Sequence, residues 1–318
     1  MKMKIFITGH DGFIGSHMVE RLQNDHELVF LEYDLRDHAQ VRAQLQYCNP
    51  DVIVHLAART EVEDSFYEQI VFSEVNYVGT VNLIESAVAL PNLKNFVFAS
   101  TMEVYGWQPI SDVIRDGKED GIIAFDEDTQ PNPNAPYAVA KYGCEKYLEY
   151  AHRSFGLPFT AIRQTNAYGR KDNNFFVTEQ IIWQMLNNSE EIFLGYGKPY
   201  RNFIYIEDLL DAWEEVIRNP EKCVGEIFCL GPNNAIRISD YVDLIAKKVG
   251  WRGKINWDRK PERPGEIFLL NSSSAKISEI LGWAPKVSLD EGLNKTVAVW
   301  KELVRNNGNF KNVTNIVR

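Results

Sequence analysis

The stretch Thr8–Leu22, TGHDGFIGSHMVERL, decides the fold class of this chain. It follows the apolar run KIFI and spaces Gly9, Gly12 and Gly15 three residues apart at a predicted strand-to-helix turn. Glycine allows a tight turn and lets the backbone approach a pyrophosphate, whose charge a helix N-terminus favours. Glu32 ends the next predicted strand about 20 residues further on, where a ribose diol needs an acceptor. The stretch therefore predicts a dinucleotide-binding turn.

The first half of the chain alternates β-branched runs with amphipathic helical patterns. The runs KIFITG, ELVFLEY, DVIVHLAA and NFVFAST show no internal alternation, which is typical of a parallel sheet covered on both faces. We expect an α/β fold with a doubly wound parallel sheet, a Rossmann domain, over residues 1–165. The pattern over residues 166–318 predicts a smaller second α/β lobe, with some strands returning to the first domain.

The composition excludes several classes of protein. The chain has 318 residues and a formal net charge of −10, which argues against a protein that neutralises nucleic-acid phosphates. No apolar run approaches the roughly 20 residues that span a bilayer. We expect a cytoplasmic protein with no metal and no nucleic-acid or membrane partner. Its cysteines fit neither a metal pair nor a disulfide framework and are expected to be buried thiols: Cys48, Cys144, Cys223 and Cys229.

Residues 100–106, STMEVYG, follow the apolar run NFVFA and carry three polar side chains at alternate positions. If the strand continues through them, its period of two turns Thr101, Glu103 and Tyr105 to one face. The stretch then presents a hydroxyl, a carboxylate and a phenol together. The acid-rich residues 107–136 that follow predict a solvated connection.

Two Tyr-x-x-x-Lys pairs come next, Tyr137–Lys141 and Tyr142–Lys146. Residues four apart on a helix are neighbours, so a lysine ammonium can favour the ionised form of a phenol. Tyr137 follows NPNAP and is predicted to lie in the first helical turn, on the side of the cleft. The second pair is turned about 140° away and is expected to pack or to face solvent.

Several motifs share their order and approximate spacing with one known family: TGHDGFIG, PDVIVHLAA, NYVGTVNLIESA, FASTMEVYG, PYAVAK, RQTNAYG, RNFIYIEDLLDAW, RPGE and LGWAPKVSLDEGL. Together they resemble the extended short-chain dehydrogenase/reductases, the NAD-dependent nucleotide-sugar epimerase/dehydratase family, over nearly the whole chain. The resemblance implies a Rossmann lobe that holds NAD(P) and a C-terminal lobe that binds a nucleoside-diphosphate sugar. It also implies a homodimer formed through the helices over VNYVGTVNLIESA and AVAKYGCEKYLEYAHRSF.

The resemblance also assigns roles to single residues. Tyr137 is the catalytic phenol, Lys141 its electrostatic partner, and Thr101 the hydroxyl that hydrogen-bonds the reacting oxygen. Glu103 is a candidate base and acid at C5 of the sugar. The implied substrate contacts are Asn166, Arg201 and Arg263. The implied cofactor contacts are Gly9, Gly12, Phe13, Ile14, Gly15, Glu32, Asp34, Leu35, Leu56, Ala57, Ala58, Asn76, Tyr137 and Lys141.

The reaction stays open between a 4-epimerase and a 4,6-dehydratase, which both begin with hydride transfer from C4 and pass through a 4-keto sugar. Met102 stands where dTDP-glucose 4,6-dehydratases carry an acid, and a thioether cannot donate a proton. A reductase of nucleotide 4-keto-6-deoxy sugars is an alternative. The second predicted strand joins the DLRD segment with almost no loop between them, and in this the chain resembles 4-keto-sugar reductases that act on GDP-6-deoxy-mannose. The rival from another class is a catalytically silent dinucleotide-binding protein, against which Thr101, Tyr137 and Lys141 argue.

We expect NAD to be preferred over NADP, because Glu32 or Asp34 beside the ribose repels a 2′-phosphate. Arg36 is close enough in sequence to reverse this preference if its side chain turns inward. The family's usual Arg-Asp before the FIYI strand is Arg201-Asn202 here, and the sequence gives no reason for the change. GDP, UDP, CDP and dTDP sugars all stay open.

Overall fold

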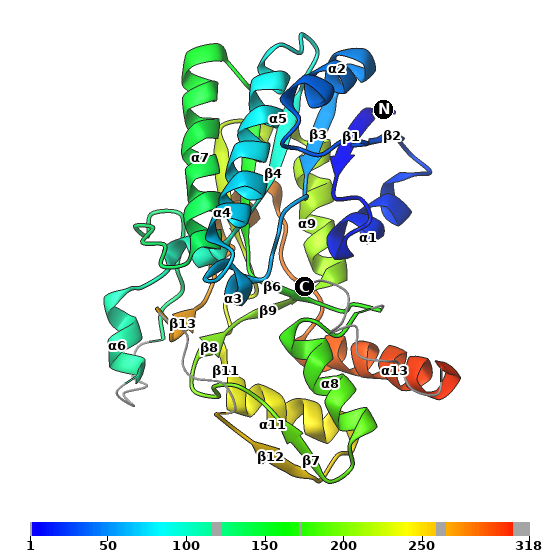
Figure 1. The fold of residues 1–318 in the computed structure, drawn as a ribbon, viewed down its shortest axis with the longest axis vertical. Coiled ribbons are helices and arrows are strands. Elements are labelled where there is room, and N and C mark those ends of the chain that lie inside the picture. The colour runs from blue at the N-terminus through cyan, green and yellow to red at the C-terminus, as the bar shows by residue number, and fades with distance from the viewer. Residues whose placement is uncertain (1, 116–121, 172, 259–264, 308–318) are drawn as a thin grey trace.

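A six-stranded sheet forms the centre of the molecule (Figure 1). The computed structural model describes residues 2–115, 122–171, 173–258 and 265–307. The strand order of the sheet is β10-β5-β4-β3-β1-β2, and all neighbouring strands are parallel. These strands are β1 (Lys4–Thr8), β2 (Glu27–Phe30), β3 (Val52–His55), β4 (Asn95–Thr101), β5 (Phe159–Gln164) and β10 (Glu226–Leu230).

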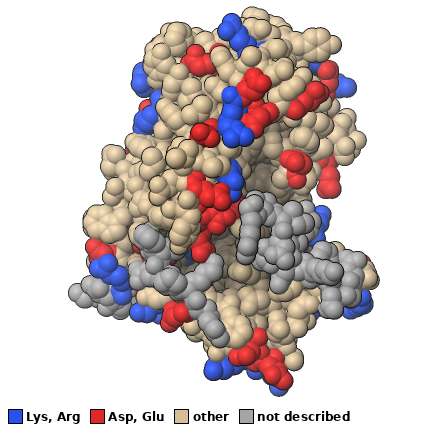
Figure 2. All heavy atoms as spheres, viewed as in Figure 1, with Lys and Arg blue, Asp and Glu red and all other residues tan. Residues whose placement is uncertain are grey.

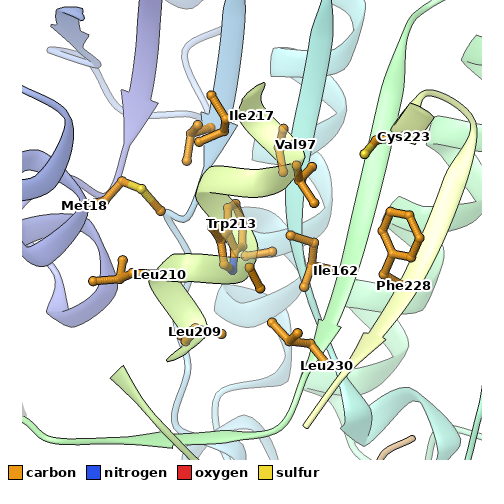
Figure 3. Close-up of a cluster of buried hydrophobic side chains, with 14 of the residues drawn as sticks. Met18, Val97, Ile162, Leu209, Leu210, Trp213, Ile217, Cys223, Phe228 and Leu230 are labelled. Atoms are coloured by element: carbon orange, nitrogen blue, oxygen red, sulfur yellow. The ribbon is translucent and has the colours of Figure 1, made fainter. Parts of the chain in front are cut away.

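Helices cover both faces of this sheet, because its central strands are apolar on both sides. One face packs against α1 (Phe13–Leu22), α9 (Ile206–Arg218) and α12 (Ala275–Leu281). Trp213 of α9 is fully buried among Val97, Ile162 and other apolar side chains of this layer (Figure 3). The other face packs against α2 (His38–Cys48), α5 (Gly79–Val88) and α7 (Pro136–Phe155). The predicted doubly wound α/β fold is confirmed.

The strand order reverses next to β1. The chain runs from β1 to β2 at the sheet edge and then crosses to β3 on the other side of β1. Ligands of open α/β sheets bind at the carboxyl ends of the strands beside such a reversal. The fold therefore puts the turns after β1, β3 and β4 on one edge of the sheet, which faces the second half of the chain in Figure 1.

The second half of the chain builds a smaller layer at that edge (Figure 1). Helices α8 (Val177–Asn187), α11 (Ile238–Val249) and α13 (Leu289–Asn307) supply its apolar core, which includes Tyr241 and Trp300. β10 and α9 rejoin the main sheet, and the division at residue 165 stays a prediction. The small sheets of this layer contain β6 (Asn166–Tyr168), β7 (Glu191–Phe193), β8 (Tyr200–Arg201), β9 (Phe203–Tyr205), β11 (Ile236–Arg237), β12 (Lys254–Asn256) and β13 (Leu269–Leu270).

The strand that the alternation of polar residues after β4 would require is not formed, and the solvated connection that follows is more structured than expected. The strand ends at Thr101, and residues Met102–Tyr105 form the 3₁₀ helix η2. Tyr105 is completely buried and does not share a face with the Thr101 hydroxyl. The expected solvated connection contains helix α6 (Pro109–Arg115) and the buried Phe125, which bridges to Ser272.

Acidic side chains gather near the middle of the face drawn in Figure 2, and Lys and Arg are scattered around them. Among the described helices, none is long and apolar enough to cross a membrane. The same described ranges contain no cluster of His, Cys, Asp and Glu that could hold a metal ion. The remaining short elements are α3 (Val62–Ser65), α4 (Gln69–Phe72), the π-helix η1 (Ser73–Val78) and α10 (Pro220–Cys223).

Candidate active site

The turn after β1 forms a backbone cradle of the kind that holds a phosphate. Gly9 has φ +70°, a left-handed conformation that favours glycine. A Cβ on Gly15 would lie 2.0 Å from the carbonyl oxygen of Gly9, so only glycine fits there. Helix α1 starts at Phe13 directly behind Gly12 and has no side-chain cap, which leaves its first N–H groups for an anion. Ile14 packs into the core behind the turn, and the cradle fits the pyrophosphate of a dinucleotide.

Two exposed acids follow β2, as the sequence predicts for the ribose end of a dinucleotide site. The Glu32 backbone N–H donates to Gln44 Oε1 at 3.2 Å, and its side chain is exposed. The Arg36 guanidinium donates to the two carboxylate oxygens of Asp34 at 3.0 and 2.7 Å, and this pairing lowers the pKa of Asp34 to about 2. Leu35, between the two paired residues, is buried. Arg36 is therefore turned toward Asp34.

The segment after β3 lies against the glycine turn. A Cβ on Gly9 would lie 2.7 Å from the backbone nitrogen of Ala57, so the two backbones touch. The Ala57 N–H donates to Thr8 Oγ1 at 3.1 Å. The Asn76 side-chain amide pairs with the backbone N–H and C=O of Arg59, at 2.8 Å each. The predicted cofactor contacts that gather on this segment are Leu56, Ala57, Ala58 and Asn76.

Thr101 and Tyr137 meet at the carboxyl end of β4. Tyr137 is the second residue of α7, and its phenol lies near enough to the Thr101 side chain for that hydroxyl to influence its pKa. Thr101 Oγ1 also accepts the backbone N–H of Glu103 at 3.1 Å, which fixes the start of η2. Burial raises the pKa of Tyr137 above its usual value, the negative charge of Glu103 raises it further, and the nearby Thr101 hydroxyl opposes the shift. Glu103 therefore lies within electrostatic reach of the phenol, although no strand carries it there.

Lys141 is buried one helical turn after Tyr137. Its ammonium group donates to the carbonyl oxygen of Ala99 at 2.7 Å, and burial lowers its pKa to about 8. The second Tyr-x-x-x-Lys pair differs, because Lys146 is half exposed, lies over the ring of Tyr142 and pairs with Glu149. The expectation that the second pair packs or faces solvent is confirmed, and the expectation that Tyr137 lies on the side of the cleft stays a prediction.

Two of the predicted substrate residues, Asn166 and Arg201, lie on short strands of the second half of the chain. Asn166 begins β6 and is exposed. Arg201 is 8% exposed, and its guanidinium donates to Glu266 at 3.2 Å and to the carbonyl oxygen of Tyr200 at 2.9 Å. Arg263 lies outside the described residues. The contacts of Asn166 and Arg201 with a substrate stay predictions.

The family of this chain follows from a comparison with known families. The model of the family described as GDP-mannose 4,6 dehydratase matches residues 20–296, most of the chain. The chain belongs to this family. The predicted membership in the extended short-chain dehydrogenase/reductases and the expectation of an enzyme are thereby confirmed.

Relatives of this GDP-mannose 4,6 dehydratase family member include both reaction types. A dTDP-D-glucose 4,6-dehydratase of Homo sapiens is 28% identical over 342 residues, covering 98% of this chain and 92% of the relative. A UDP-glucose 4-epimerase from Thermotoga maritima, solved with UDP-glucose, has a TM-score of 0.83 at 28% identity and covers 95% of this chain and 100% of its own. A dTDP-glucose 4,6-dehydratase from Streptomyces venezuelae, solved with NAD, has a TM-score of 0.82 at 25% identity, with 95% and 98% covered.

Asn202 stands where the family's usual sequence has an aspartate. It is 1% exposed, and its carbonyl oxygen accepts the Thr165 hydroxyl at 2.8 Å. Its side chain also contacts Thr165 and lies against Gly231. Within the described ranges its side-chain nitrogen Nδ2 is buried and has no hydrogen-bond partner. Nothing in the structure explains the change from aspartate.

Sequence reasoning missed two features of the site in this family member. The negative charge of Glu61, after β3, also raises the pKa of Tyr137, and nothing in its sequence context signals this. Arg163 and Glu145 form a buried ion pair at 2.8 Å. The Arg163 guanidinium also donates to the phenol oxygen of Tyr105, in η2, at 2.8 Å. The four-residue spacing of Glu145 from Lys141 could have indicated that both face the sheet.

Proposed function

We propose that this protein is an NAD-dependent nucleotide-sugar epimerase/dehydratase that acts through a 4-keto sugar. The observation that carries the proposal is that Thr101, Tyr137 and Lys141 lie together on the sheet edge that also carries the glycine turn. A structural protein has no use for a buried phenol, hydroxyl and amine at that edge. The relatives named above support both the epimerase and the dehydratase activity.

NAD, when bound, accepts a hydride from a carbon of the sugar and can return it. Tyr137 removes the proton of the C4 hydroxyl as the hydride leaves, and Thr101 holds the reacting oxygen by a hydrogen bond. The pKa of Tyr137 is raised in the protein alone, so the phenol needs added positive charge before it can act as a base. We assign this added charge to the oxidised cofactor, and we keep Lys141 as the electrostatic partner that the family resemblance implies, although it is not among the groups that shift the Tyr137 pKa in the protein alone.

Glu103 decides between the two branches of the proposal. Once C4 is a carbonyl, the hydrogen at C5 becomes acidic, and a carboxylate beside it can remove that hydrogen and protonate the leaving hydroxide at C6. Glu103 is near enough to Tyr137 to influence its pKa, which supports this role. Met102 is buried and cannot supply the second acid of a dTDP-glucose-type site. A 4-epimerase would use Glu103 only as a hydrogen-bonding group, so we keep both branches.

We do not favour the reductase alternative, because the relatives reported above are epimerases and dehydratases. For the substrate we propose a nucleoside-diphosphate sugar held by Asn166, Arg201 and Arg263. Arg201 is paired with Glu266 at 3.2 Å, so a diphosphate has to share or replace this carboxylate. The ribose acids Glu32 and Asp34 favour NAD over NADP.

We also propose a homodimer through η1, α5 and α7. η1 and α5 both pack beside α7, and their outer surfaces expose several apolar side chains, namely Tyr77, Val78, Val139 and Tyr150. Apolar side chains grouped in this way on neighbouring helices are typical of an interface. Light scattering at working concentration tests this, and a monomeric mass contradicts it. We propose the cytoplasm as the compartment, in keeping with the four buried, unpaired cysteines.

Product analysis tests the function. The protein is incubated with NAD and, in turn, UDP-, GDP-, CDP- and dTDP-hexoses, and the products are analysed by mass spectrometry and NMR. A 4-epimerase yields a sugar of unchanged mass with inverted C4, and a 4,6-dehydratase yields a product lighter by one water. A protein that binds NAD but converts none of these sugars is the silent dinucleotide-binding rival.

A further inference from the structure

His55 is a buried titratable residue that the proposed chemistry does not use. It is the last residue of β3, is 1% exposed and lies opposite Thr8 in the register of β1 and β3. Both of its ring nitrogens have hydroxyl partners: Nδ1 lies 2.7 Å from Thr8 Oγ1, and Nε2 lies 2.8 Å from Thr80 Oγ1. The direction of each hydrogen bond follows from the partners of those two hydroxyls.

The Thr80 hydroxyl has only one hydrogen. Its oxygen lies 2.6 Å from the carbonyl oxygen of Asn76, which can only accept, so the hydrogen points to Asn76. Thr80 Oγ1 must therefore accept at its contact with the ring. This requires a hydrogen on Nε2 of His55.

The other ring nitrogen has the opposite role. A neutral imidazole with a hydrogen on Nε2 has a bare Nδ1, which accepts the hydroxyl hydrogen of Thr8. Thr8 Oγ1 in turn accepts the backbone N–H of Ala57 at 3.1 Å. Every hydrogen in the chain from Ala57 through Thr8, His55 and Thr80 to Asn76 thus has one acceptor. A second ring hydrogen on Nδ1 would leave the Thr8 hydroxyl hydrogen without an acceptor in this chain.

The surroundings of the ring also oppose a charge. The Phe98 ring stacks on His55 with centroids 5.7 Å apart, and the Phe96 ring meets it edge-on at 6.0 Å. The ammonium group of Lys141 lies 4.8 Å from the Phe98 centroid. Burial lowers the pKa of His55, and the positive charge of Lys141 lowers it further. Cys144, whose thiol donates to the Asn76 carbonyl at 3.2 Å, is the other titratable group at this chain of hydrogen bonds.

We propose that His55 is a positioning residue for the cofactor, held as the neutral Nε2–H tautomer so that it joins the turns after β1 and β3 to Asn76. Thr8 directly precedes Gly9, whose backbone touches that of Ala57. At the other end, the Asn76 side chain holds the backbone of Arg59. The chain of hydrogen bonds therefore fixes the cofactor-facing backbone before the cofactor binds. This reduces the conformational entropy that the protein loses on binding. The inference rests on the proposed function, because these turns are assigned there to NAD.

The tautomer is tested in the protein without cofactor by ¹⁵N NMR of labelled histidine. We expect Nε2 of His55 to be protonated and Nδ1 to be bare, with no titration between about pH 5 and 8. A hydrogen on Nδ1, or a charge change near the ordinary histidine pKa of about 6.5, overturns the proposal. This readout needs no bound ligand and no activity.

The positioning role is tested by calorimetric titration of NAD into Thr80→Val and His55→Phe. Thr80→Val keeps the shape of the side chain and breaks the chain of hydrogen bonds, so we expect the NAD dissociation constant to rise about tenfold. The double variant should weaken binding little further, because both changes break one chain. His152→Phe is the matched control, since His152 makes one hydrogen bond to Leu157 at the far end of α7. NAD affinity unchanged within twofold in Thr80→Val overturns the inference, and a wild-type protein that binds no NAD overturns the proposed function as well.

Discussion

The Lys141 ammonium group donates a 2.7 Å hydrogen bond to the carbonyl oxygen of Ala99 in β4. The positive charge of Lys141 is therefore fixed against β4, two residues before that strand ends at Thr101 and η2 begins. In the protein without cofactor, the pKa of Tyr137 is shifted by its burial and by three residues, Glu103, Thr101 and Glu61. Lys141 contributes a buried positive charge beside the site, at a cost to stability that can be measured.

That cost gives the first prediction. The pKa of Lys141 falls from 10.5 to about 8 on folding, so between these pH values the unfolded chain binds more protons than the folded chain. Stability then rises with pH through this window, and the cost is complete below it. Lys141→Met should stabilise the protein without cofactor at pH 7 by up to about 3 kcal/mol, and the difference should shrink towards pH 10.

Denaturant unfolding of wild type and variant over this pH range checks the prediction. Lys146→Met is the control, because Lys146 is half exposed and should show no such pH dependence. A Lys141→Met variant that is less stable at pH 7 by an amount independent of pH would contradict the buried-charge account.

The second prediction concerns the phenol. Tyr137→Phe keeps the ring and removes the phenol oxygen beside Thr101. Turnover should fall by about two to four orders of magnitude, as for the loss of a positioned general base, while NAD affinity stays nearly unchanged. Tyr142→Phe serves as control, because Tyr142 belongs to the pair that turns away from the sheet edge. A larger effect of Tyr142→Phe would mean that the catalytic pair is misassigned.

Asp34 and Arg36 give a prediction about cofactor choice. Asp34 holds the Arg36 guanidinium by two hydrogen bonds, and Glu74 lies 3.8 Å from the same group. Wild type should prefer NAD over NADP, because the acids repel a 2′-phosphate. Asp34→Asn should release Arg36 and lower the ratio of the NADP to the NAD dissociation constant by about tenfold, since a guanidinium binds phosphate well. Calorimetry measures the ratio, and tighter NADP binding by wild type would show that Arg36 turns inward already.

Much of the sheet was predictable, because its signals are local. The runs over β1, β3 and β4 are apolar without alternation, and the glycine spacing after β1 is a short-range pattern. Tyr137 could be assigned to the first helical turn because a proline precedes it. These features depend on neighbours in sequence, so a sequence reading finds them.

The turn after β4 was not predictable for the opposite reason. The alternation of Thr101, Glu103 and Tyr105 mimics a strand, but the Thr101 hydroxyl captures the Glu103 N–H and starts a 3₁₀ turn. The Tyr105 phenol is then held by Arg163 and by Cys229, which is 124 residues away. Contacts of this range leave no local pattern, and the same holds for the two-residue strands β8, β11 and β13.

The role of Glu103 gives the fourth prediction. Glu103→Gln removes a carboxylate whose charge raises the pKa of Tyr137, so the phenol should ionise at least as readily. Oxidation at C4 should then persist, while exchange of the C5 hydrogen with deuterium from heavy water should stop. Mass spectrometry of the recovered sugar nucleotide measures the exchange. If wild type oxidises a sugar at C4 and incorporates no deuterium, Glu103 is not a C5 base and the 4-epimerase branch holds.

The most direct test of the central claim is a stopped-flow measurement of a single turnover, in which reduced nicotinamide is detected by its absorbance at about 340 nm. The protein is loaded with NAD and mixed with each candidate nucleotide sugar, beside the Tyr137→Phe variant as control. Our account predicts a transient or stable rise with at least one sugar in wild type, slowed by at least about a hundredfold in Tyr137→Phe. No rise with any nucleotide sugar, or a rise of equal rate in Tyr137→Phe, would contradict hydride removal from C4 with Tyr137 as the base.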